Sequence, residues 1–157
     1  MSDFERVETL FYRGSGLVGT LIKWQTRSPY SHVALRRGDT VIEAREFRGV
    51  IKRPFNEEQD GAAERYHVVL PLPAGILESV NDLAWEWAEE RVGCPYDYPA
   101  VLRFISRRSA EVNENWFCSE FAFGAWQYAG AVLLDRTEMW EVAPGLLIRA
   151  PDFWRVR

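Results

Sequence analysis

The alternation of hydrophobic and polar positions predicts strands in the first half of the chain. Short runs rich in β-branched and aromatic residues are typical of strands. Such runs cover Arg6–Tyr12, His32–Arg37, Thr40–Ala44, Val50–Lys52 and Tyr66–Leu72. Gly38-Asp39 separates the second run from the third, and a dipeptide of this kind is typical of a β-hairpin turn. The pattern therefore predicts an antiparallel sheet.

The second half of the chain has the spacing of helices. Apolar residues recur every three or four positions over Ile76–Val92, which predicts a helix that buries one face. This stripe consists of Leu77, Val80, Leu83, Ala84, Trp87 and Ala88. Gly93 is well placed to end the helix. Further helices are predicted over Tyr98–Arg108 and Trp116–Ala129, and a short one over Leu17–Gln25.

The order of these elements indicates the fold class. Pro54–Ala63 is polar and is predicted to be a loop, and the tail from Met139 is predicted to be irregular. Strands followed by helices predict an α+β fold, with a small antiparallel sheet packed against helices. The chain has 157 residues and no internal repeat or linker, so we expect a single domain over residues 1–157.

Composition and charge narrow the class of protein. Hydrophobic residues make up 47% of the chain and charged residues 27%, a balance that supports a folded core. The net charge of −4 argues against nucleic acid as a partner. Two cysteines are too few for a disulfide scaffold and favour a reducing compartment. Neither a secretion signal nor an apolar run of roughly 20 residues is visible, so we expect a cytoplasmic protein without a membrane segment.

Cys118 is the most suggestive single residue. It lies at the predicted start of a helix, where unpaired backbone N–H groups and the helix dipole favour an anion. A thiolate there could attack a carbonyl, and the same N–H groups could stabilise the oxyanion. The alternative is a buried cysteine that acts as a small hydrophobic residue.

A nucleophilic cysteine needs a base, and the sequence holds only two histidines. His67 lies inside a predicted strand and is expected to be structural. His32 lies where a loop becomes a strand, a common place for functional side chains. A two-residue turn at Arg37-Gly38 places Glu43 directly opposite His32, and a turn at Gly38-Asp39 places it diagonally on the same face. A three-residue turn would separate them, and Glu43 would then be an ordinary surface acid.

Other kinds of site are less well supported by the sequence. The cysteines and histidines lack the spacing of a zinc site, so we expect no metal. Gly14-x-Gly16 follows a predicted strand, but it lacks the further glycines and the lysine of a phosphate-binding loop.

Five segments of the sequence are similar to motifs of a known family and occur in the same order as in that family. They are LFYRG at 10–14, SPYSHVA at 28–34, VIEA at 41–44, GCPYD at 93–97 and FCSE at 117–120. Together they resemble the permuted NlpC/P60 cysteine hydrolases, in particular the YiiX/YebB-like branch, over roughly residues 7–150.

The resemblance implies a circularly permuted papain-like fold in which the histidine strand precedes the cysteine helix. It implies that Cys118 is the nucleophile, His32 the base and Glu43 the third polar member. It also places Tyr96 near the oxyanion and the substrate, although a packing tyrosine is the alternative.

The function implied is a hydrolase of the amidase or peptidase type that cleaves an amide or ester through a thioester. We expect a small peptide, amide or acyl substrate and no cofactor. The alternatives are an acyltransferase or lipid hydrolase that uses the same residues, and a catalytically silent binding module that keeps the fold. The sequence shows no export signal or wall-binding domain, which weakens a cell-wall peptide as the substrate.

Overall fold

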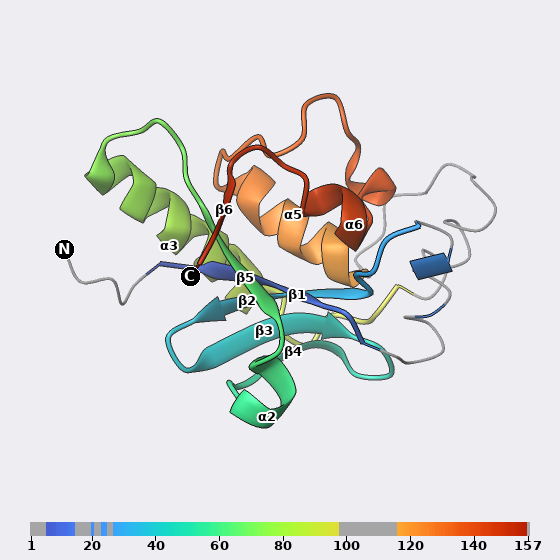
Figure 1. Ribbon diagram of the computed structural model, residues 1–157. Coiled ribbons are helices and arrows are strands. Elements are labelled where there is room, and N and C mark those ends of the chain that lie inside the picture. The colour runs from blue at the N-terminus through green and yellow to red at the C-terminus, as the bar shows by residue number, and fades with distance from the viewer. Residues whose placement is uncertain (1–5, 15–19, 21–22, 25–26, 98–115, 157) are drawn as a thin grey trace.

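The computed structural model describes residues 6–14, 20, 23–24, 27–97 and 116–156. Its strands form one six-stranded antiparallel sheet in the order β4-β3-β2-β1-β5-β6, shown in Figure 1. The elements in chain order are β1 (Glu8–Tyr12), β2 (His32–Arg37), β3 (Thr40–Arg45), β4 (Gly49–Pro54), α2 (Glu57–Asp60), β5 (Glu64–Val68), α3 (Ala74–Glu90), α5 (Cys118–Tyr128), η2 (Met139–Glu141), α6 (Pro144–Leu147) and β6 (Phe153–Arg155). The predicted α+β class and antiparallel sheet are confirmed.

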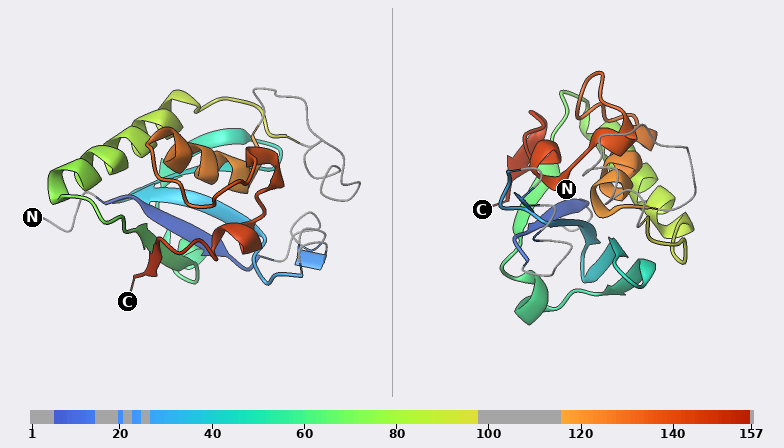
Figure 2. Two further views of the ribbon diagram at one scale, coloured as in Figure 1. Left: turned by 90° about the horizontal axis from the view of Figure 1, so that it is seen from above. Right: turned by 90° about the vertical axis from the view of Figure 1, so that its right-hand side faces the viewer.

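Helices α3 and α5 pack against each other, and α5 lies on one face of the sheet against β2 and β3. Figure 2 shows the two helices on the same side of the sheet. The short helix α2 lies on the opposite side (Figure 1). The sheet therefore has a helical layer on one face and the β4–β5 connection on the other.

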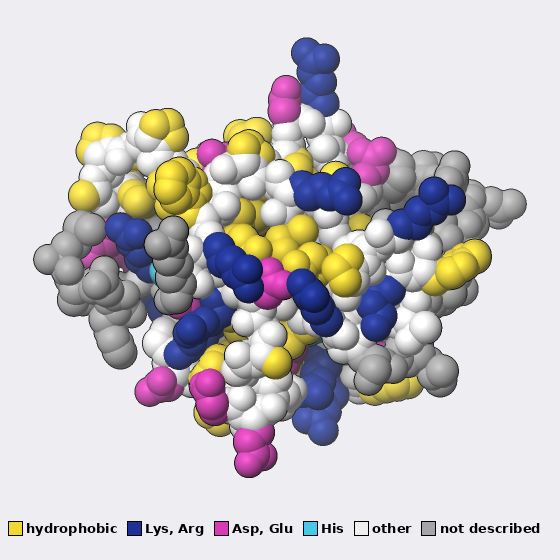
Figure 3. Space-filling model, in the orientation of Figure 1, with side chains coloured by type: hydrophobic (Ala, Val, Ile, Leu, Met, Phe, Trp, Pro, Cys, Tyr) yellow, Lys and Arg dark blue, Asp and Glu magenta, His cyan; other side chains and the backbone are white. Residues whose placement is uncertain are grey.

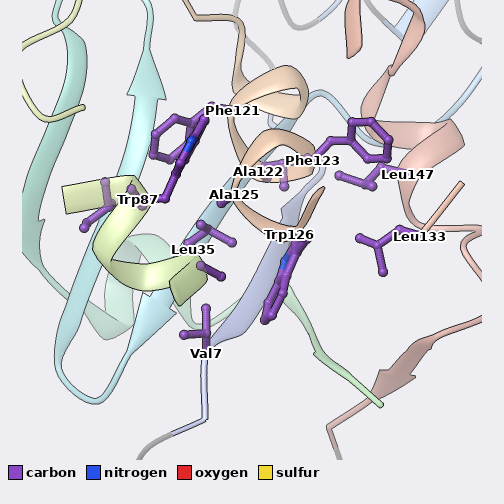
Figure 4. Close-up of a cluster of buried hydrophobic side chains, with 14 of the residues drawn as sticks. Val7, Leu35, Trp87, Phe121, Ala122, Phe123, Ala125, Trp126, Leu133 and Leu147 are labelled. Carbon is purple, nitrogen blue, oxygen red and sulfur yellow. The ribbon is translucent and has the colours of Figure 1, made fainter. Parts of the chain in front are cut away.

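The main core lies between the sheet and these two helices. Phe121, Ala122, Ala125 and Trp126 of α5 are completely buried there, and Leu35 of β2 is buried with them, as Figure 4 shows. Apolar residues three and four positions apart give α5 the continuous face that this packing needs. A smaller cluster on the other face contains Leu10, Ala34 and Val41.

Polar contacts join the helices to β1 and to the residue just before it. The Asn81 side chain in α3 accepts a hydrogen bond from the Val7 N–H at 2.8 Å. The Trp126 indole N–H in α5 donates to the Thr9 hydroxyl at 3.0 Å. Since buried polar groups are costly unless they are bonded, these contacts specify where each helix lies along the sheet.

Several predicted boundaries differ from the structure. Tyr66–Leu72 was expected as a strand, but pairing covers Glu64–Val68, and the prolines that follow lack the N–H for a ladder bond. The loop predicted over Pro54–Ala63 contains the helical turn α2, which Asn56 caps by accepting from the Glu58 N–H at 3.0 Å. Within α3, Leu83 is partly exposed and Asn81 is buried in its place.

The tail from Met139 is not irregular throughout. It contains the 3₁₀ turn η2, the short helix α6 and strand β6, which pairs with β5. The short length of these elements explains why periodicity did not reveal them. The helix predicted over Tyr98–Arg108 lies outside the described residues, as does most of the one predicted over Leu17–Gln25. No helix among the described residues is long and apolar enough to cross a membrane.

Candidate functional site

The hairpin of β2 and β3 fixes the relative position of His32 and Glu43. Leu35 pairs with Ile42 and Arg37 with Thr40, so the turn is at Gly38-Asp39. This is the second of the two registers considered from the sequence, and it places Glu43 diagonally from His32 on the same face. Ile42 and Ala44, on either side of Glu43, belong to the main core, and Glu43 therefore points to the other face.

The His32 ring and the Glu43 carboxylate are in direct contact. Nε2 of His32 lies 2.5 Å from one Glu43 oxygen, and the Arg53 side chain donates to the other oxygen from 2.6 Å. The Glu43 side chain is only 2% exposed. This excludes the alternative that Glu43 is an ordinary surface acid.

Cys118 is the first residue of α5 and Phe117 is its N-cap, so the helix begins two residues after the predicted start and keeps Cys118 in its first turn. Figure 1 shows that α5 begins near the end of the sheet at which β2 begins. There the Cys118 side chain lies close enough to His32 to raise the pKa of that ring by hydrogen bonding and charge. Its exposed fraction is 1%, so the sulfur is nearly buried but is not surrounded by apolar groups alone.

The start of α5 is held in place by polar contacts. The Ser119 hydroxyl donates to the Val142 carbonyl at 2.5 Å. The Glu120 carboxylate accepts from the Phe117 N–H at 3.3 Å, which satisfies one of the N–H groups that a helix leaves unpaired at its start. Both Ser119 and Glu120 are buried. These contacts, together with the Trp126–Thr9 bond, fix the position of Cys118 relative to the sheet.

The surroundings of His32 favour its charged form. Burial by itself lowers the pKa of His32, but the hydrogen bonds and charges of Cys118 and Glu43 outweigh it and raise this pKa from 6.5 to about 10. The stability that His32 contributes is therefore complete below pH 6.5 and is lost as the pH rises through about 10.

The pKa of Glu43 moves in the opposite direction. Burial raises it, but the hydrogen bonds and charges of His32 and Arg53 prevail and lower the pKa from 4.5 to about 2. The corresponding stability is present above pH 4.5 and is lost as the pH falls through about 2. Between a pH of about 2 and a pH of about 10, His32 is an imidazolium and Glu43 is a carboxylate.

Further side chains extend this polar cluster, and the sequence analysis missed them. One is Arg45, whose guanidinium lies 3.8 Å from the Glu43 oxygen that Arg53 contacts. Arg53 in β4 donates to both Asp60 oxygens, at 2.7 and 2.8 Å. The Tyr12 hydroxyl also donates to Asp60 at 2.8 Å, and the Tyr12 ring lies 5.3 Å from the His32 ring. In the β3–β4 pairing Ile51 is the partner of Glu43, so Arg53 is the diagonal neighbour of Glu43 on the same face. A correct assignment of β4 from the sequence would have predicted this contact.

Tyr96, the predicted substrate-binding residue, is buried in the main core. Its ring meets that of Phe117 edge-on at 6.1 Å, directly before Cys118 in the chain. The role predicted for Tyr96 stays a prediction. Cys94 is partly buried and packs against the same core, and its carbonyl accepts from the Val50 N–H at 2.8 Å.

A second charged cluster lies where β1, β5 and β6 pair. Glu64 accepts from Arg13 at 2.5 Å and from the hydroxyls of Tyr30 and Tyr66 at 2.9 and 3.0 Å, and Arg155 lies 3.7 Å away. On the face in Figure 3, basic and acidic side chains are interspersed. These contacts hold no thiol or imidazole, so the Cys118–His32–Glu43 cluster is the better candidate for a reactive site.

Comparison with known proteins supports the fold. No protein-family model matches the chain, and no curated protein matches its sequence. Among solved structures, the metalloprotein YiiX (DUF1105) from Escherichia coli O157:H7 matches with a TM-score of 0.60 and 14% sequence identity. The match covers 98% of this chain and 96% of the YiiX chain. The chain therefore has a YiiX-like fold, in which a six-stranded antiparallel sheet is packed with helices.

Proposed function

We propose that the chain is a thiol hydrolase in which Cys118 is the nucleophile, His32 the base and Glu43 the residue that orients the base. One observation carries this proposal. The Cys118 side chain at the start of α5 adjoins the His32 imidazole of β2, which in turn contacts the Glu43 carboxylate of β3, so that sulfur, imidazole and carboxylate from three elements lie in series. The proposal includes a circularly permuted papain-like arrangement within one domain, residues 1–157.

The chemistry uses each group in a defined role. The proton of Cys118 is held by His32 as the imidazolium, the charged form that its surroundings favour, and the thiolate attacks the carbonyl carbon of an amide or ester. The carbonyl electron pair moves to oxygen, where backbone N–H groups at the start of α5 stabilise the charge. Collapse of this intermediate breaks the bond to the amine or alcohol, which takes the proton from His32, and a thioester is left on Cys118.

Water completes the reaction. His32 takes a proton from water, the resulting hydroxyl attacks the thioester, and the carbon–sulfur bond breaks. The acid is released, and the sulfur regains its proton from His32. Throughout these steps Glu43 stabilises the imidazolium and fixes the ring orientation, since it occupies Nε2 and leaves Nδ1 for the sulfur.

YiiX is described as a metalloprotein, which raises the question whether the residues of this chain could hold a metal ion. Among the residues that the structure describes, no group of three or more His, Cys, Asp or Glu side chains is arranged to hold a metal ion. At the cluster itself, both Glu43 oxygens already have partners, and one partner is the Arg53 cation. These residues do not fit a metal, and the proposed mechanism uses none.

An activated aryl ester tests the reaction directly. We expect p-nitrophenyl acetate to release nitrophenol in a burst, with one acetyl group found on the Cys118 peptide by mass spectrometry and then lost through hydrolysis. Cys118→Ala should remove the burst, and Cys94→Ala should preserve it. A burst that persists in Cys118→Ala, or acetylation of Cys94 instead, would refute the assignment of the nucleophile.

The same experiment separates the alternatives. An acyltransferase or lipid hydrolase forms the same thioester, but it passes the acyl group to an added amine or alcohol faster than to water, or prefers long-chain esters. A silent binding module forms no thioester at all.

A further inference from the structure

We propose that the Arg53–Asp60 ion pair is a positioning element for His32, because it holds both of the groups that orient the His32 ring. The inference rests on the proposed function, in which that ring is the base. It concerns Arg53 of β4, an edge strand of the sheet, and Asp60 of α2, the short helix on the side of the sheet opposite to α5.

The first connection runs through Glu43. One Glu43 oxygen bonds Nε2 of His32, and the other accepts from Nε of Arg53 at 2.6 Å. A carboxylate bonded on both oxygens cannot rotate about its terminal torsion without breaking one bond. Arg45 is the other cation near this oxygen, but at 3.8 Å it is beyond hydrogen-bond distance, so Arg53 is the group that keeps the Glu43 carboxylate directed at the imidazole.

The second connection runs through Tyr12. Cα pairing between β1 and β2 sets Tyr12 opposite His32, and the two rings lie 5.3 Å apart at 49°. The Tyr12 hydroxyl donates to the Asp60 oxygen Oδ1, which also accepts from Arg53. Glu43 contacts a ring nitrogen of His32 and Tyr12 packs beside the ring. Glu43 is bonded to Arg53 and Tyr12 to Asp60, so both contacts depend on the same ion pair.

The ion pair itself is rigid. Asp60 is completely buried, and the Arg53 side chain is only 14% exposed. Arg53 binds both Asp60 oxygens through its two terminal nitrogens, and the Asn56 backbone N–H donates to Asp60 at 2.8 Å. A planar guanidinium bound in this two-pronged way has a fixed orientation, which a lysine cannot reproduce.

A positioning role of Arg53 and a purely electrostatic role of Arg53 predict opposite changes in the pKa of His32. If Arg53 acted only as a nearby cation, its removal would raise the pKa of His32, since positive charge disfavours the imidazolium. If Arg53 positions Glu43, its removal frees the carboxylate to move from the ring, and the pKa of His32 falls. Arg53→Lys keeps the charge and loses the geometry, so it separates the two effects again.

The test is an NMR pH titration of the His32 ring, made in Cys118→Ala protein so that Glu43 and Tyr12 are its described partners. We expect Arg53→Met and Arg53→Lys each to lower the pKa of His32, by about one unit for Met. Tyr12→Phe keeps the ring contact but loses the bond to Asp60, and should lower this pKa less. In protein that retains Cys118, Arg53→Met should slow alkylation of Cys118 by iodoacetamide about tenfold or more.

Arg36→Met is the matched control. Arg36 is another largely buried arginine of the same sheet, paired with Glu8 at 3.1 Å. Its loss should leave the pKa of His32 and the alkylation rate of Cys118 unchanged. A rise or no change of the His32 pKa in Arg53→Met overturns the positioning role, as does normal behaviour of Arg53→Lys. The His32 titration does not depend on thiol chemistry, so failure of the hydrolase proposal would appear separately, as an unreactive Cys118 in otherwise native protein.

Discussion

Replacing His32 by alanine is expected to reduce turnover of an activated ester by about 10²–10⁴-fold, the usual contribution of a positioned acid–base group. Alkylation of Cys118 at neutral pH should slow by about tenfold or more. Without a base, only a few per cent of a free thiol is ionised near pH 7. The greater intrinsic nucleophilicity of a more basic thiolate offsets part of that loss.

The near burial of Cys118 makes this result informative. Removing the imidazole opens space beside a sulfur that is 1% exposed, so access improves while activation is lost. A slower reaction in His32→Ala therefore cannot be a consequence of restricted access. His67→Ala provides the control, since His67 lies in β5, paired with Glu8 and Trp154. An alkylation rate that is unchanged or faster in His32→Ala would contradict activation by His32.

Replacing Trp126 by alanine should lower the free energy of unfolding by about 3–5 kcal/mol, the range for truncating a large buried aromatic. Trp126 is completely buried in the main core, and its loss also leaves the Thr9 hydroxyl without this donor. Because the Trp126–Thr9 bond fixes α5 along the sheet, the Cys118–His32 contact should weaken as well. Urea unfolding measures the first effect, and the alkylation rate of Cys118 under native conditions measures the second.

Trp154→Ala is the matched control, because the same side chain lies largely exposed on β6. Its effect on stability should stay within about 1 kcal/mol. Equal losses of stability in the two variants would contradict the role of Trp126 in the core, and an unchanged alkylation rate in Trp126→Ala would show that α5 does not depend on Trp126 for its position.

The sequence was most informative where periodicity and turn chemistry act locally. The Gly38-Asp39 turn predicts the β2–β3 hairpin, and the observed register is one of the two that place His32 and Glu43 on the same face. Similarly, the helix predicted over Trp116–Ala129 places Cys118 in its first turn, and α5 begins at this residue. These placements are confirmed, whereas the catalytic roles of the residues stay predictions.

The sequence was least informative where tertiary contacts decide the outcome. Asp60 reads as one more acid in a polar loop, yet it is completely buried because Arg53, Tyr12 and the Asn56 N–H satisfy it. Asn81 replaces Leu83 on the buried face of α3 because it bonds the Val7 N–H. Strand β6 has only three residues and is defined by its pairing with β5, so it is too short for a local sequence pattern to predict it.

The central claim is that Cys118 and His32 act on each other, and titration of the His32 ring by NMR tests it most directly. In the native chain we expect the ring to stay protonated well above its ordinary pKa of 6.5, towards about 10. In Cys118→Ala this pKa should fall, because the partner sulfur is gone, while Glu43 still supports the charged form. A His32 pKa that is the same with and without the Cys118 sulfur would contradict the account.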